Sequence, residues 1–188
     1  MRYFITIILF ILSHTFINAK TIMQIEVSGN IDGFIQIELM ENISPNHVKQ
    51  IIQLANDKQY DGVAFHRVIE GFMAQTGDVK FGNVYSGFSK DMVGRGGSNL
   101  KNIKAEFSDI PFDRGIVGMA RSQNPNSANS QFFIMLADGH FLNGNYTVFG
   151  KVISGMDVVD QIKKGDPDKN GMIEKNPDFM KEVLIKNK

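Results

Sequence analysis

The segment FHRVIEGFMAQTGD, residues 65–78, places a single arginine, Arg67, inside a strand-like run of apolar residues. An aromatic residue, a methionine and a glutamine follow, and the segment contains no serine or cysteine nucleophile. Because strand residues alternate between two faces, Arg67 is predicted to share a face with Phe65, and His66 to point to the opposite side. His66 is therefore a poor catalytic partner for Arg67. The segment indicates a fixed positive charge beside apolar surface.

The composition fits one globular domain with room for a sizeable core, because 43% of the 188 residues are apolar and 21% are charged. The formal net charge is zero and no block of like charges occurs, which argues against nucleic-acid or membrane binding. Cysteine is absent, which removes disulfides, thiolate chemistry and cysteine-ligated metals. No Ser-His-Asp pattern or metal-ligand cluster indicates a hydrolase. We expect neither a cofactor nor a metal.

Residues 1–19 read as a secretory signal peptide. Arg2 precedes an apolar run over about residues 3–12, and small or polar residues follow up to Ala19. The apolar run is short for a bilayer span, although an uncleaved membrane anchor is the alternative. We expect cleavage after about Ala19, a periplasmic or secreted domain over residues 20–188, and no stable membrane association after cleavage.

The start of the mature chain predicts a β-hairpin followed by a helix. Residues 21–28 and 34–39 alternate around a turn at residues 30–33. Ser44 precedes a proline, a pattern typical of a helix start, and its side chain is expected to cap the helix. The helical stripe ends at about Asn56.

The rest of the chain contains short strands, a second helix and one long loop. The glycine-rich segment 78–105 is expected to be a surface loop with at most one short strand, serving either as a partner surface or as an inert excursion. No regular strand–helix alternation occurs, which favours an antiparallel β-barrel or sandwich with helical caps. The remaining strands are expected at 63–69, 115–119, 131–136, 146–153 and 182–185, and the second helix at 156–162.

Three blocks, residues 60–78, 118–134 and 141–150, together resemble the cyclophilin family. The resemblance covers nearly the whole mature chain, from about Lys20 to Ile185. It implies a closed eight-stranded antiparallel β-barrel capped by two α-helices, with the substrate groove on its outer face. It also implies peptidyl-prolyl cis-trans isomerase activity on proline-containing peptides and unfolded proteins, from a protein we expect to be a monomer.

The resemblance implies that Arg67 is the catalytic residue. A twisted amide loses resonance, so the prolyl nitrogen recovers a lone pair that a positioned donor can bind. From periodicity alone, Arg67 would be read as a surface residue and the apolar residues as ordinary core. The substrate-binding residues implied by the family are Phe72, Met73, Gln75, Ala120, Arg121, Gln131, Phe133, Phe141, Leu142 and Tyr146. Strand alternation assigns Phe132 to the core and Phe133 to the groove.

The sequence departs from the best-known eukaryotic cyclophilin pattern at three positions. Phe141 stands where that pattern has tryptophan, Tyr146 where it has histidine, and Arg121 where it has asparagine. The first two replacements are similar to bacterial cyclophilins. Because phenylalanine has no N–H donor, we predict weak cyclosporin binding with isomerase activity retained.

Other features have ordinary interpretations. His47 is expected on the surface of the first helix, and His140 near the rim of the groove. Residues 166–171 imitate half of an EF-hand loop, but Pro177 stands where the loop needs its last carboxylate, so we interpret them as an acidic turn. The alternative function is a non-catalytic chaperone, or holdase, that binds proline-containing segments without requiring Arg67.

Overall fold

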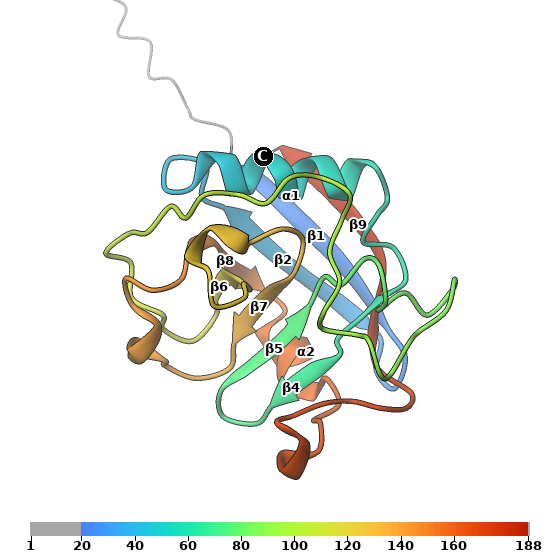
Figure 1. Ribbon diagram of the computed structural model, residues 1–188. Helices are drawn as coiled ribbons and strands as arrows, with labels where there is room; N and C mark the ends of the chain where they lie inside the picture. The colour runs from blue at the N-terminus through green and yellow to red at the C-terminus, as the bar shows by residue number, and fades with distance from the viewer. Residues whose placement is uncertain (1–19, 188) are drawn as a thin grey trace, which may run out of the picture.

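The computed structural model describes residues 20–187, and the predicted signal peptide lies outside this range. Nine strands form one antiparallel sheet in the order β3-β9-β1-β2-β8-β6-β7-β5-β4. Figure 1 shows the long strands β1, β2 and β9 behind the shorter β4, β5 and β7, with α1 across the top. Within the described range, no helix has the length and apolar character needed to cross a membrane.

The elements follow the predicted pattern except at two places: the sequence analysis did not predict β5, and the predicted strand 63–69 is divided in two. Three short 3-10 helices lie at Pro125–Ser127, His140–Leu142 and Pro167–Lys169. The strands and α-helices are β1 Thr21–Ser28, β2 Gly33–Leu39, α1 Pro45–Asn56, β3 Val63–Ala64, β4 Arg67–Ile69, β5 Met73–Thr76, β6 Ile116–Met119, β7 Phe132–Met135, β8 Val148–Ser154, α2 Met156–Gln161 and β9 Phe179–Asn187.

The expected single strand 63–69 is broken into β3 and β4, and together with the unpredicted β5 this gives nine strands instead of the eight that the resemblance implies. β3 and β4 lie at opposite ends of the sheet order, although only Phe65 and His66 separate them in the chain. The Phe65 amide donates to Asp178 O on the β9 side (2.8 Å), and the His66 amide donates to Gln75 O on β5 (3.2 Å). The predicted closed eight-stranded barrel is therefore corrected to a curled nine-stranded sheet whose two ends are nearly consecutive in sequence.

The break also makes the predicted alternation wrong. Phe65 and Val68 both pack in the main core, whereas Arg67 is half-buried on another side. Phe65 and Arg67 consequently do not share a face. Alternation does hold in β7, where Phe132 is fully buried in the main core and Phe133 belongs to a second, smaller cluster.

The buried apolar residues form two clusters, a main core and a smaller second cluster. The main core joins β1, β2, β9 and α1 through residues such as Met23, Ile37, Ile51 and Val183. The second cluster contains Met73, Phe112, Ile116, Phe133, Met135, Leu142 and Val148. Three of its residues, Met73, Phe133 and Leu142, were predicted to bind substrate, so the second cluster includes part of the candidate site.

The N-terminus of α1 corrects two predictions. Ser44 does not cap the helix; its hydroxyl donates instead to Val148 O at 2.8 Å. Glu106 provides the cap, because its carboxylate accepts from the amides of Asn46 (3.2 Å) and His47 (3.1 Å). His47 is fully buried, with Nδ1 2.6 Å from the same carboxylate, and is not a surface residue. The yellow-green loop that brings Glu106 here runs along α1 in Figure 1.

Candidate active site

Arg67 lies on β4 with its guanidinium fixed at all three nitrogens. Nε donates to Asn170 O (3.0 Å), and Nη2 donates to Asn170 Oδ1 (2.9 Å). Nη1 donates to Gln75 Oε1 (3.2 Å) and lies 3.7 Å from Met73 Sδ. All of these acceptors are neutral, and burial lowers the pKa of Arg67 below its ordinary value. The guanidinium still keeps its charge, so the site presents a cation with a fixed orientation and, among residues 20–187, no carboxylate paired with it.

An apolar cavity of about 270 Å³ adjoins this guanidinium. Phe133 lines this cavity, and its ring stacks with Phe112 (centroids 5.7 Å apart) and meets Tyr146 edge-on (5.8 Å). Phe141 is 71% exposed and packs against Phe72 at 5.4 Å. The lining residues are Arg67, Phe72, Met73, Gln75, Ala120, Arg121, Phe133, Phe141, Leu142 and Tyr146. The structure thus brings together every residue of the predicted site except Gln131.

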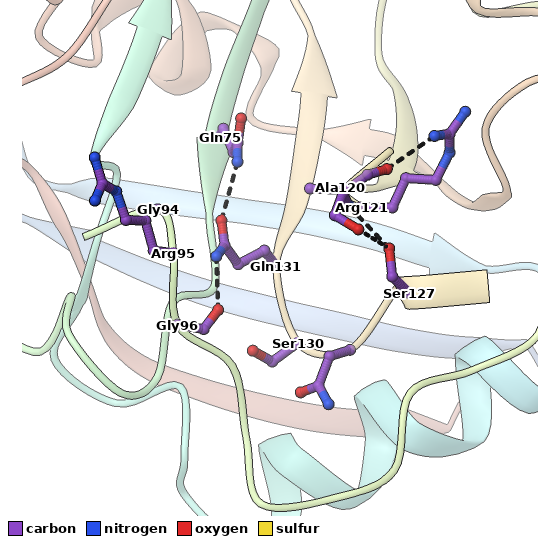
Figure 2. A pocket seen from close by; sticks show the side chains of 11 residues that line it. Gln75, Gly94, Arg95, Gly96, Ala120, Arg121, Ser127, Ser130 and Gln131 are labelled. Atoms are coloured by element: carbon purple, nitrogen blue, oxygen red, sulfur yellow. Dashed lines mark hydrogen bonds between the residues drawn. The ribbon is translucent and has the colours of Figure 1, made fainter. Parts of the chain in front are cut away.

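Gln131 lines a second cavity of about 360 Å³ that shares Gln75, Ala120 and Arg121 with the first. Figure 2 shows Gln131 between Gln75 and Gly96, with a hydrogen bond to each. Gln75 Nε2 donates to Gln131 Oε1 (3.0 Å), and Gln131 Nε2 donates to Gly96 O (2.7 Å). A continuous chain of hydrogen bonds therefore runs from Arg67 through both glutamines to the wall of the second cavity.

The wall of the second cavity is held by Asp78, which the sequence analysis did not assign to the site. Its buried carboxylate accepts from the amides of Gly94 (2.7 Å) and Gly96 (2.9 Å) through Oδ2. Oδ1 accepts from the amides of Lys80 (3.1 Å) and Phe81 (2.9 Å). The first part of the glycine-rich segment, residues 80–96, is thus held at both of its ends by one carboxylate. The aspartate at the start of a glycine-rich segment was the available sequence signal.

Arg121 braces the opposite wall. Its guanidinium lies over the Tyr146 ring at 4.4 Å, and Nε and Nη2 both donate to Asn145 O (3.1 and 2.8 Å). Nη1 donates to Ser122 O at 2.9 Å. Because backbone acceptors and an aromatic ring hold this side chain, Arg121 ties the segment after β6 to the segment before β8.

His140, which was expected near the rim of the groove, is next in sequence to Phe141, a residue that lines the first cavity. It is exposed and places Nε2 2.7 Å from Asp113 Oδ1. With Asp138 these residues form an exposed group whose potential ligand atoms lie within 4.8 Å of one another. Exposed groups of this kind are common without an ion, so we assign no metal to it.

Sequence comparisons identify relatives along nearly the whole described chain. Residues 22–187 match the family model for cyclophilin type peptidyl-prolyl cis-trans isomerase/CLD. A Brucella suis protein named probable peptidyl-prolyl cis-trans isomerase is 65% identical over 154 residues, covering 82% of this chain and 78% of the relative. Peptidyl-prolyl cis-trans isomerase B of Escherichia coli K12 is 35% identical over 161 residues, covering 81% and 90%.

Structural comparison gives the same family. A crystal structure of a Cryptosporidium parvum cyclophilin type peptidyl-prolyl cis-trans isomerase in the presence of the dipeptide Ala-Pro superposes with a TM-score of 0.72. It is 26% identical, and the match covers 88% of this chain and 98% of the other. With the fold, the fixed arginine and the apolar cavity in place, the chain belongs to the cyclophilin-type peptidyl-prolyl cis-trans isomerases.

Proposed function

We propose that this isomerase lowers the X–Pro rotation barrier through one hydrogen bond, donated by Arg67 to the prolyl nitrogen of the twisted amide. Resonance gives the planar amide a barrier of about 20 kcal/mol, and no covalent bond has to break. Catalysis requires only that the twisted state be bound more tightly than either planar isomer. The nitrogen lone pair is available only in that twisted state, so a donor placed there acts selectively on the barrier.

The observation that carries this mechanism is the fixed guanidinium at the edge of an apolar cavity. Asn170 and Gln75 hold it at three nitrogens through neutral oxygens, which leaves its charge intact. A donor oriented before the reaction needs little reorganisation, and such donors are commonly worth about 3–4 kcal/mol in the transition state. Arginine is suited to this role because it donates without taking part in proton transfer.

The proline ring is proposed to occupy the apolar cavity against Phe72, Met73, Phe133 and Leu142. These side chains offer dispersion contacts and no competing hydrogen bonds, so the ring is held while the other side of the amide turns. Gln75 is proposed to bond the substrate backbone near the rotating carbonyl. Ala120, Arg121 and Gln131 line the adjoining groove, where an extended peptide can add beside the backbone at Arg121 as a strand would. Proline-containing peptides and unfolded proteins are the proposed substrates.

We also propose that the domain acts outside the cytoplasm, as a monomer, after cleavage near Ala19. The charge and hydropathy order of residues 1–19 supports this location. Mass measurement of the mature protein from fractionated cells tests it. A mature chain that begins near Lys20 in the exported fraction is expected, and a full-length chain in the membrane fraction would support an anchor instead.

Weak cyclosporin binding is also proposed, because the phenylalanine at position 141 has no N–H donor.

The mechanism is tested by NMR exchange on a short Ala-Pro peptide, comparing wild type with Arg67→Ala and Arg67→Lys. Loss of the single donor is expected to reduce kcat/KM by about 100- to 1000-fold. Lysine should restore little, because it lacks the planar fork that Asn170 and Gln75 hold. Undiminished catalysis by folded Arg67→Ala would refute the role of Arg67. If suppression of aggregation survives in an inactive Arg67→Ala protein, the holdase function acts alongside catalysis.

A further inference from the structure

The segment 165–173, which contains the 3-10 helix Pro167–Lys169, covers the edge of β4 that β5 leaves free. The Val68 amide donates to Gly171 O (2.8 Å), and the Gly165 amide donates to Val68 O (2.9 Å). The Ile173 amide donates to His66 O at 2.9 Å. The catalytic strand is therefore hydrogen-bonded on both sides, by β5 on one and by this turn on the other.

The turn is the segment whose sequence imitates half of a calcium loop, and its side chains have another use here. Asp166 Oδ1 accepts from the Asp168 amide (3.0 Å) and caps the 3-10 helix. Lys169 and Glu174 pair at 2.8 Å across the outside of the turn. The acidic and basic residues thus stabilise the turn itself.

Asn170 adopts a left-handed backbone conformation (φ 54°, ψ 37°) at the end of this turn. Asparagine tolerates that region better than most residues. Gly171 follows with φ 76°, and a Cβ there would overlap the side chain of Ile69. The turn is consequently pressed against β4, and this close approach brings Asn170 to the level of Arg67.

Asn170 presents two acceptors that match two donors of the guanidinium. Its carbonyl oxygen accepts from Arg67 Nε at 3.0 Å, and its Oδ1 accepts from Nη2 at 2.9 Å. A carboxylate could make the same two-point contact, but it would pair with the positive charge. The neutral oxygens of Asn170 fix the plane of the guanidinium without that pairing. Without them, the described contacts of Arg67 would be confined to Nη1, with Gln75 and Met73.

We propose that Asn170 is the positioning residue of Arg67. It holds Nε and Nη2 so that the guanidinium stays in one plane at the edge of the proline cavity while the amide rotates. This inference rests on the proposed function of Arg67, and it assigns a role in the reaction to the turn at residues 166–171.

The test compares Asn170→Gly with Asn176→Gly as a matched control. Both asparagines have left-handed backbones (φ 54° and 49°), so glycine relieves the same conformational preference at each. Only Asn170 contacts Arg67. Asn170→Gly is expected to lower kcat/KM for the Ala-Pro peptide by about ten- to a hundredfold, with KM changed by less than about twofold. Asn170→Asp keeps Oδ1 and is expected to retain more activity than Asn170→Gly. Asn176→Gly is expected to behave as wild type.

Two readouts separate positioning from general stability. Asn170→Gly removes Oδ1, the acceptor of Nη2, and keeps the backbone oxygen that accepts from Nε. Hydrogen exchange of the Arg67 Nη2 protons, followed by NMR, is therefore expected to accelerate in Asn170→Gly and to remain unchanged in Asn176→Gly. In an Arg67→Ala background, Asn170→Gly is expected to cause less than about a twofold further loss of kcat/KM. An equal loss of kcat/KM with and without Arg67, or unchanged exchange of the Nη2 protons, overturns the proposal. Full activity of Arg67→Ala overturns the proposed mechanism as well, and the exchange measurement still reports whether Asn170 holds the guanidinium.

Discussion

His66 offers a quantitative prediction about stability and pH. The side chain is 3% exposed, and among the described residues neither ring nitrogen has a hydrogen-bond partner. Burial lowers the pKa of His66 from 6.5 to about 4, against the opposing attraction of the Asp78 carboxylate. Its ring packs against Gly94, where a Cβ would lie 3.5 Å from Nε2. The folded protein therefore holds His66 as a neutral imidazole.

The sign of the pH effect follows from this lowered pKa. As pH falls below 6.5, the unfolded chain takes up a proton at His66, whereas the folded chain does so only near pH 4. The unfolded state binds more protons in this window, so the free energy of unfolding falls with falling pH. The full difference corresponds to roughly 3 kcal/mol, of which about 2 kcal/mol is lost between pH 7.5 and pH 5.

His66→Phe removes the titration and keeps a ring in the site. Urea unfolding at pH 7.5 and pH 5.0 is expected to show a pH-dependent loss about 2 kcal/mol smaller in the variant than in wild type. His47, whose pKa burial also lowers, remains in both proteins and leaves part of the slope. His140→Phe, at an exposed position, controls for the loss of a histidine. Equal pH dependence in wild type, His66→Phe and the alternative variant His66→Gln would refute the reasoning.

Two further substitutions test other contacts. Glu106→Ala removes the cap of α1 and leaves buried His47 Nδ1 without its partner. The free energy of unfolding is expected to fall by about 2–4 kcal/mol, which calorimetry should detect as a melting temperature lowered by roughly 5–15 °C. An unchanged melting temperature would contradict the role of Glu106 as the cap. Phe141→Trp adds an N–H donor at a residue that is 71% exposed and lines the cavity. Cyclosporin affinity, measured by titration calorimetry, is expected to rise by about tenfold for one hydrogen bond. Equal affinity of the two proteins would show that the missing donor does not limit cyclosporin binding.

Local patterns predicted most elements and missed those whose environment comes from distant parts of the chain. Alternation predicted β1 and β2 because one face of each is buried more than the other. β5 was missed because it has four residues, three of them buried, and no alternation. His47 was misplaced because a helix stripe contains no information about the loop that covers it. That loop brings Glu106, which is 59 residues away in sequence, to the start of α1.

In the candidate site, too, the sequence predicted some residues and missed those whose contacts come from distant parts of the chain. The resemblance named the residues that line the two cavities, and the structure brings them together. It did not name Asn170, which accepts hydrogen bonds from Arg67, or Asp78, which holds the loop that lines the second cavity. The contact between Arg67 and Asn170 spans 103 residues of sequence. No periodicity or motif could have paired an arginine in a strand with an asparagine in an acidic turn, because that pairing depends on how the turn packs against β4.

The break between β3 and β4 explains why Arg67 can serve the site at all. In an uninterrupted strand, Arg67 would share a face with Phe65, which is fully buried in the main core. An arginine there would be a charge removed from water without a partner, which is strongly unfavourable. At the break, successive amides bond to opposite ends of the sheet, Phe65 to Asp178 O and His66 to Gln75 O. The chain thereby keeps Phe65 in the core and brings Arg67 out beside Gln75, at the edge of the apolar cavity. The break that places β3 and β4 at opposite ends of the sheet order thus also presents the proposed donor.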